Sequence, residues 1–215
     1  MGRWILVLVA LTVLLPQSTA ADTWSSPLHV RVYDNTQLPL DQLTAALDGA
    51  GDVLASIGLA VQWHGCSTAA RVASEPRPAL EQAPWCGEPL AINELALRVV
   101  HAATPLEYRG QLSLGDSLID QRLRIGVLAT IYLERVEWLA QAADVPVTPL
   151  LARAIAHEIG HLLLGSPHHA TSGLMRPVWR REDLQHEQPD DWTFTAADAN
   201  AIRARRRDAD VIALP

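Results

Sequence analysis

The chain has 215 residues, a length that fits a single domain of ordinary size. Hydrophobic residues make up 49% of the chain, enough to build a packed core, and this excludes a disordered or low-complexity protein. The formal net charge is −7 at pH 7, and a net acidic chain is a poor candidate for binding nucleic acid.

The first twenty residues have the pattern of a cleavable signal peptide. Arg3 supplies the positive start, and residues 4–15 form an apolar run that is too short to span a bilayer. Small residues at 18–20 suit a cleavage site. We therefore expect a signal peptide at residues 1–20, a single secreted or periplasmic domain at 21–215, and no membrane insertion after cleavage. The alternative is an uncleaved membrane anchor.

The first half of the mature chain predicts strands around one helix. Residues 28–34 alternate apolar and polar side chains, the period of a half-buried strand. Residues 38–58 carry apolar side chains at helical spacing, and Gly58 is suited to end that helix. Residues 59–66 and 94–102 have the pattern of two further strands.

The two cysteines predict a disulfide. Cys66 and Cys86 are an even pair in a chain that we expect to be exported, where such pairs oxidise. Between them lies a segment rich in proline and alanine, which has the composition of a surface excursion. A bridge would close this excursion into a loop of about twenty residues.

The middle of the chain is less regular. Within residues 104–121, Gly110 and Gly115 bracket a short element that we expect to be an edge strand. Residues 123–143 begin as an apolar run, typical of a strand, and change to a helical period near Glu134.

Two more helices are predicted toward the C-terminus. Thr148 and Pro149 suit the N-cap and first position of a helix that Gly165 would end. Thr195 suits the N-cap of a last helix, whose arginine-rich end at 203–207 is expected to be solvated. The order of elements predicts an α/β (α+β) fold in which helices pack against a mixed twisted sheet.

His157, Glu158 and His161 form the sequence H-E-x-x-H on the first of these helices. Side chains four residues apart lie one above the other, so both imidazoles can bind one metal ion. Glu158 is displaced around the helix and can act as general base toward a water on zinc. Chance would produce this spacing in about one chain in a hundred, but the capped helix and the residues that follow favour the metal site.

The stretch HEIGHLLLGSPHHATSGLM at 157–175 resembles the metzincin clan of zinc peptidases. Its first part is similar to their motif H-E-x-x-H-x-x-G-x-x-H, and SGLM at 172–175 is similar to their Met-turn. The resemblance implies a metzincin-like zincin fold with an active-site helix and a short C-terminal helical subdomain. It also implies bound Zn²⁺ and Met175 beneath the metal. Gly160, a helix-weakening residue inside the helix, indicates that something packs closely against the backbone.

The third metal ligand is open between two neighbouring histidines. The metzincin motif would place its glycine and third histidine at 164 and 167, where Leu164 and Pro167 stand. A helix longer by one residue would make His168 the ligand. The stretch is more similar to the pattern H-E-x-G-H-L-L-L-G-x-x-x-H-x-x-x-G-x-M of a group of exported bacterial proteins, and that resemblance implies His169. The other histidines have no ligand spacing, and we expect structural or surface roles for them: His29, His64, His101 and His186.

The sequence therefore predicts a zinc-dependent hydrolase, a secreted or periplasmic metalloendopeptidase that acts as a monomer on peptides or proteins. The alternative is a zinc-binding protein-interaction module of the same fold with little or no turnover. A purely structural zinc site normally has four protein ligands and has no need of Glu158, which favours the enzyme.

Overall fold

The structure, a computed structural model, describes residues 26–66, 84–91, 93–102, 113–186 and 188–212. The predicted signal peptide at 1–20 lies outside the described residues, and so does Gly110. Among the described residues, no helix combines the length and the apolar character needed to cross a membrane.

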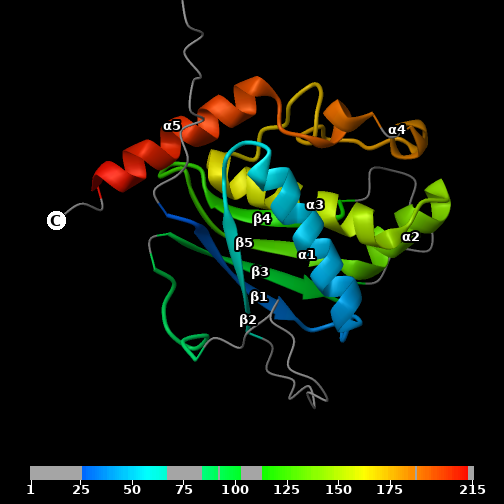
Figure 1. The fold of residues 1–215 in the computed structure, drawn as a ribbon, viewed down its shortest axis with the longest axis horizontal. Coiled ribbons are helices and arrows are strands. Elements are labelled where there is room, and N and C mark those ends of the chain that lie inside the picture. Colours follow the sequence, from blue (N-terminus) through cyan, green and yellow to red (C-terminus); the bar gives the residue numbers. More distant parts are fainter. Residues whose placement is uncertain (1–25, 67–83, 92, 103–112, 187, 213–215) are drawn as a thin grey trace, which may run out of the picture.

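A five-stranded mixed sheet forms the centre of the fold, with the strand order β2-β1-β3-β5-β4 (Figure 1). Three neighbouring pairs of strands are parallel, and β4 runs antiparallel to β5 at one edge. This mixed sheet confirms the expected fold class. The strands are β1 (Leu28–Asp34), β2 (Val61–Gly65), β3 (Glu94–Val100), β4 (Gly115–Asp120) and β5 (Ile125–Tyr132).

The edge strand lies later in the chain than predicted. Gly115 does not bound the strand but begins it, paired with Ile131 of β5. Close packing explains why a glycine occupies this position of the strand. A Cβ atom there would lie 2.8 Å from the Cγ atom of Glu158. The glycine therefore marks a close approach between the strand and a helix, one of the known uses of glycine inside strands.

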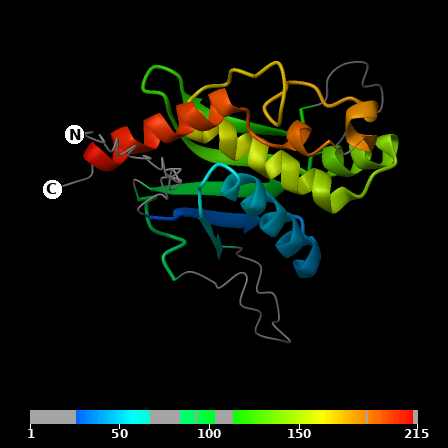
Figure 2. The same cartoon turned by 45° about the horizontal axis from the view of Figure 1, so that its top comes forward.

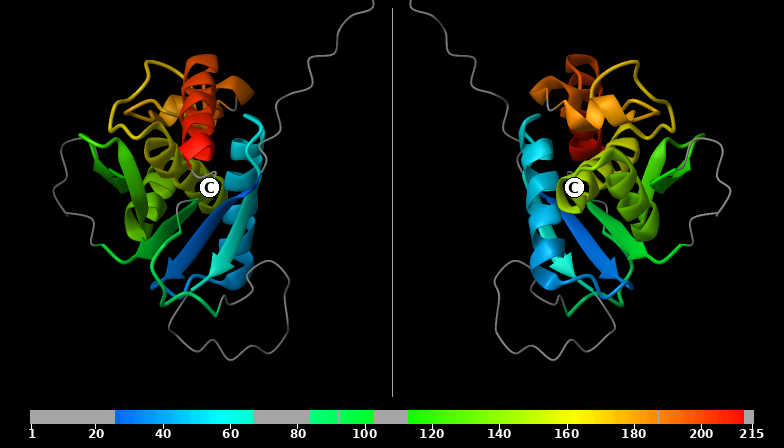
Figure 3. Two further views of the ribbon diagram at one scale, coloured as in Figure 1. Left: turned by 90° about the vertical axis from the view of Figure 1, so that its left-hand side faces the viewer. Right: turned by 90° about the vertical axis from the view of Figure 1, so that its right-hand side faces the viewer.

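Helices α1 (Leu40–Ala55) and α3 (Val147–Leu164) lie side by side on one face of the sheet, and α2 (Leu133–Ala143) follows β5 directly (Figures 2 and 3). The core fills the space between them. Its members with almost no exposed surface come from both layers: Val30, Leu97 and Ile131 from the strands, and Leu47, Leu54, Leu151, Ile155 and Ile159 from the helices.

The boundaries of α3 differ from the prediction at one end only. The helix begins at Val147, with Pro146 as the N-cap, so Pro149 lies in the first turn rather than at its first position. A proline is tolerated there because N–H groups of the first turn have no partner within the helix. Gly165 ends the helix as predicted, in the left-handed conformation with φ 55°.

The C-terminal part consists of α4 (Arg181–Gln185), the 3₁₀ turn η1 (Pro189–Trp192) and α5 (Ala196–Ile212), which packs across α3 (Figure 1). The predicted cap of α5 is confirmed, because the backbone N–H of Asp198 donates to Thr195 Oγ1 at 3.2 Å. The Asp198 carboxylate in turn accepts from the backbone N–H of Thr195 at 3.1 Å. These two bonds form a reciprocal capping box.

The arginine-rich end of α5 is solvated only in part, because Arg207 is exposed as expected but Arg203, Arg205 and Arg206 are half-buried. Arg203 donates from Nη2 to the carbonyl oxygen of Ile57 at 3.2 Å, just beyond α1. Arg205 donates from Nε to the carbonyl oxygen of Leu163 at 3.0 Å, in the last turn of α3. Terminal carbonyl groups of helices lack partners within the helix, and this explains why the arginines turn toward them.

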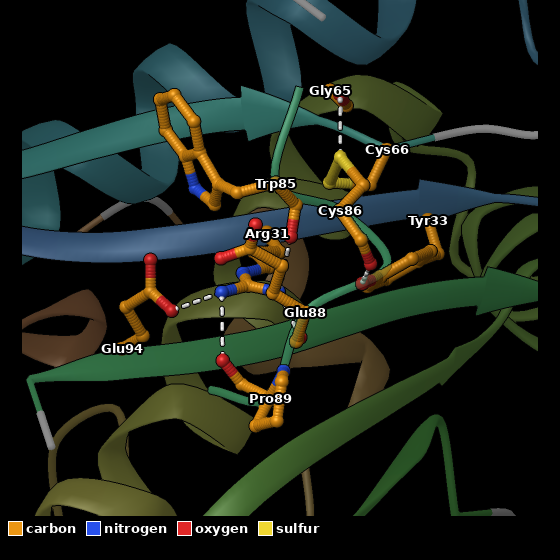
Figure 4. Close-up of a disulfide and its surroundings, with 9 residues drawn as sticks. All are labelled: Arg31, Tyr33, Gly65, Cys66, Trp85, Cys86, Glu88, Pro89 and Glu94. Carbon is orange, nitrogen blue, oxygen red and sulfur yellow. Dashed lines mark hydrogen bonds and ion pairs between the residues drawn. A yellow bond between two sulfur atoms is a disulfide. The ribbon is translucent and has the colours of Figure 1, made fainter. Parts of the chain in front are cut away.

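The opposite face of the sheet carries the segment that follows the disulfide (Figure 4). Cys66 and Cys86 form the expected bridge, with their Cα atoms 5.4 Å apart. Arg31 of β1 is only 2% exposed and pairs with the carboxylate of Glu94. Its guanidinium also donates to the carbonyl oxygen of Trp85 at 2.9 Å, so the residues next to Cys86 are fixed to the sheet by hydrogen bonds as well.

Replacing both cysteines by serine should lower the free energy of unfolding by about 3 kcal/mol, the chain-entropy value for a loop of this length. Urea denaturation of the double variant Cys66→Ser/Cys86→Ser against the oxidised wild type measures the difference. Reduced wild-type protein is the matched control, and its urea midpoint should equal that of the double variant. Equal midpoints for the oxidised wild type and the double variant would contradict a stabilising bridge.

Candidate metal centre

Helix α3 places His157 and His161 one turn apart, with their rings 4.7 Å apart between centroids. Both side chains are buried, at 8% and 5% exposure. Their Nε2 atoms approach to 3.1 Å. Two buried imidazoles thus direct the same ring atom to the same point.

The outer ring nitrogens fix which atoms carry protons. His157 Nδ1 lies 2.9 Å from the carbonyl oxygen of Leu174, and His161 Nδ1 lies 2.9 Å from that of Ser166. Because a carbonyl oxygen only accepts, each Nδ1 must carry a hydrogen and donate it. In the neutral rings both Nε2 atoms are then unprotonated, and two lone pairs face each other.

This arrangement fits a metal ion. Two lone pairs at 3.1 Å repel each other unless a cation lies beside both, and nitrogen ligands of a tetrahedral zinc ion lie about 3.3 Å apart. The carbonyl bonds to Nδ1 are the outer contacts that orient histidine ligands in metal sites.

His169 completes a group of three. It follows α3 on the loop after Gly165, and its ring lies 4.8 Å from that of His161 and 5.4 Å from that of His157. The candidate ligand atoms of the three histidines all lie within 4.8 Å of one another, a cluster that could hold a metal ion. His168 is not a member of this group, and its backbone N–H donates to Ser166 Oγ at 3.1 Å.

Desolvation favours the neutral form of these imidazoles, most strongly in the buried His157 and His161. It lowers the pKa of His157 to about 3 and that of His161 to about 4, and it also lowers the pKa of His169. A neutral ring is the form that binds metal, so near pH 7 no proton has to be removed before an ion can enter.

Glu158 directly follows His157 on α3, and its side chain is buried, with 7% exposure. Burial raises the pKa of its carboxyl group to about 7, partly offset by a hydrogen bond from Ser117, which donates to Oε2 at 2.7 Å. A carboxyl group with a pKa near 7 is suited to both accept and release protons at neutral pH. Nothing in the sequence indicates Ser117, because its position depends on which strand of the sheet borders α3.

Met175 lies in the tight turn of residues 173–176 and is fully buried beneath α3. Gly173 begins that turn with φ 72°. A Cβ atom on Gly160 would lie 2.7 Å from Met175 Sδ and 2.6 Å from Phe194 Cε1, so the close packing expected at this glycine is present. The carbonyl group that orients His157 belongs to Leu174 of the same turn.

An open cleft of about 670 Å³ lies in front of the three histidines and Glu158. One wall is β4 with the residues before it, and the other includes Trp179, whose ring meets that of His157 edge-on at 5.6 Å. Apolar side chains line much of the cleft: Leu114, Ile119, Trp138, Leu139 and Val178. The cluster is therefore reachable by a ligand of substantial size.

The remaining histidines that lack ligand spacing lie elsewhere. His29 and His64 contact each other at 3.0 Å on the opposite face of the sheet. His101 pairs with the carboxylate of Glu134, and His186 bonds the carbonyl oxygen of Glu182 at 2.8 Å. Within the described residues, none of these four belongs to a cluster of three or more potential metal ligands.

Comparisons with known proteins find structural similarity alone. No protein-family model matches the chain, and no curated protein matches its sequence. The crystal structure of archaemetzincin from Methanopyrus kandleri is similar, with a TM-score of 0.52 and 12% identity over 85% of this chain and 97% of that one. A zinc-dependent peptidase from Methanocorpusculum labreanum has a TM-score of 0.48 and 12% identity over 80% of this chain and 99% of that one. The first similarity shows that the fold is metzincin-like.

Metal-free protein should lose stability on acidification. The folded-state pKa values of His157 and His161, about 3 and 4, lie below the ordinary 6.5, so the unfolded chain binds more protons from about pH 6.5 down to about pH 4. Glu158 acts oppositely between about pH 7 and 4.5, because burial raises its folded-state pKa. The destabilising effect of the two histidines exceeds the opposite effect of the one glutamate. The free energy of unfolding should therefore fall as the pH is lowered over this window.

Urea midpoints of chelator-treated protein at pH 7 and pH 5 measure this effect. The variant His157→Leu/His161→Leu lacks both groups and should not lose stability over the same interval. A wild-type midpoint that is higher at pH 5 than at pH 7 would show that the histidines are not buried in their neutral form.

Proposed function

We propose that this protein is a zinc-dependent peptidase that acts outside the cytoplasm, with His157, His161 and His169 as the metal ligands. The observation that carries the proposal is the pair of unprotonated Nε2 atoms 3.1 Å apart at the floor of an open cleft. Three imidazoles are a ligand set typical of catalytic zinc, which keeps its fourth position for water or substrate. Met175 would be the Met-turn residue beneath the ion.

Glu158 would be the general base. When bound, zinc would lower the pKa of a water molecule and polarise the carbonyl group of the substrate. The Glu158 carboxylate accepts a proton from a water molecule in the cleft and, once protonated, can donate it to the leaving nitrogen. Its burial beside the ligands supports this role, since a buried carboxylate accepts a proton more readily than an exposed one.

The free edge of β4 supports a peptide substrate. In the described sheet, β4 has a strand neighbour on one side only, and its residues line the cleft. An extended peptide could add to this edge through backbone hydrogen bonds, which would place a peptide bond near the three histidines.

The disulfide supports a location outside the cytoplasm, where such bonds persist. It agrees with the signal peptide predicted at residues 1–20. A zinc-binding interaction module without turnover would require neither a buried carboxyl group beside the ligands nor an open cleft in front of them, so the geometry favours the enzyme.

Metal analysis tests the ligand set. Wild-type protein should bind one zinc ion per chain, and His169→Ala should weaken binding by roughly 100-fold or more because one of three protein ligands is lost. His168→Ala is the matched control, since it removes a neighbouring exposed histidine from the same loop, and should bind zinc like the wild type. Loss of zinc from His168→Ala together with retention in His169→Ala would reverse the assignment.

Activity measurements test the base. Glu158→Gln keeps the shape of the side chain but cannot take up a proton, so peptide hydrolysis should fall by about 10²–10⁴-fold while zinc stays bound. Cleavage of a broad peptide library by the zinc-loaded wild type, followed by mass spectrometry, provides the substrate for this comparison. Zinc-loaded wild-type protein that cleaves no member of the library would support the interaction module instead.

A further inference from the structure

The inward face of β4 borders the carboxyl group of Glu158. Asp116, Leu118 and Asp120 are exposed, so by strand alternation Gly115 and Ser117 point toward α3. Gly115 provides the space, because a Cβ atom there would lie 3.0 Å from Glu158 Oε1 and would crowd the side chain. Ser117 provides the polar contact.

Ser117 Oγ has two acceptors within reach. It lies 2.7 Å from Glu158 Oε2 and 2.8 Å from the backbone carbonyl oxygen of Glu158. A hydroxyl group has one hydrogen to donate and lone pairs with which to accept. It can therefore donate to only one of these oxygens at a time.

Both acceptors belong to Glu158, one on its side chain and one on its backbone. The hydroxyl of Ser117 therefore lies against a single residue of α3. When it donates to Oε2, it fixes one oxygen of the carboxyl group beside the edge strand.

Ser117 is the only hydrogen-bond partner of the Glu158 carboxyl group among the residues that the structure describes. We infer that Ser117 is a positioning residue that holds Oε2 of the catalytic base and leaves Oε1 available to a water molecule in the cleft. This inference rests on the proposed function. It assigns the edge strand a role in catalysis in addition to binding the substrate backbone.

The test compares Ser117→Ala, which removes the hydroxyl, with Ser117→Thr, which retains it. Ser56→Ala is the matched control, because Ser56 is exposed at the end of α1 and remote from the cleft. For each variant, kcat and KM on a peptide identified with the wild type are measured together with zinc stoichiometry and Tm. The position of Glu158 is read from crystal structures of the metal-free wild type and Ser117→Ala.

We expect Ser117→Ala to lower kcat by about 10- to 100-fold, the effect of one lost hydrogen bond to a charged group, with little change in KM, zinc content or Tm. Ser117→Thr should recover kcat to within about threefold of wild type, the residual cost of packing one extra methyl group. In metal-free Ser117→Ala the Glu158 carboxyl group should leave its wild-type position.

Wild-type kcat in Ser117→Ala would overturn the inference while leaving the proposed function in place. A kcat for Ser117→Thr as low as that of Ser117→Ala would also overturn it, because the hydroxyl would then not be the cause. If the zinc-loaded wild type cleaves no peptide, the proposed function fails. The crystal structures then still decide whether Ser117 holds Glu158, and an unmoved carboxyl group would overturn the inference by itself.

Discussion

Two imidazoles whose unprotonated nitrogens face each other are the constraint on which the rest of the structure depends. The contact is set by carbonyl groups from the loop after α3 and from the turn of residues 173–176, which hold the outer nitrogen of each ring. The helix supplies the spacing of His157 and His161, and the following loops supply their orientation. Backbone carbonyl groups thus orient both rings so that their Nε2 lone pairs can bind one cation.

The other elements keep that arrangement in place. Met175 and Phe194 pack against the bare backbone at Gly160, so the turn and the C-terminal segment lie directly against the helix that carries His157 and His161. Arg205 of α5 bonds the carbonyl oxygen of Leu163, which fixes the end of α3 where the chain turns toward His169. Contacts from segments that are distant in sequence therefore hold the chain in the conformation that brings His169 close to His157 and His161.

The sequence allowed prediction of much of the sheet and of the placement of His157, Glu158 and His161 on one helix, because both depend on local patterns. Strand alternation located β1, and the four-residue spacing placed His157 and His161 on one face of a helix. The register of β4 could not be predicted, because the close contacts at Gly115 are with Thr130 of β5 and Glu158 of α3, which belong to other elements. The environment of Ser117 and the hydrogen bonds of the half-buried Arg203 and Arg205 escaped prediction for the same reason, since their partners are remote in sequence.

The indole of Trp179 lies edge-on to the ring of His157 and edge-on, at 5.4 Å, to the indole of Trp192. Trp192 in turn lies beneath the guanidinium group of Arg153, 4.1 Å from the ring centroid. Trp179 is therefore an aromatic chromophore in direct contact with one of the three clustered histidines. If the proposed ligands bind an ion, the added charge would lie beside this indole, so tryptophan emission would be expected to change without any attached dye.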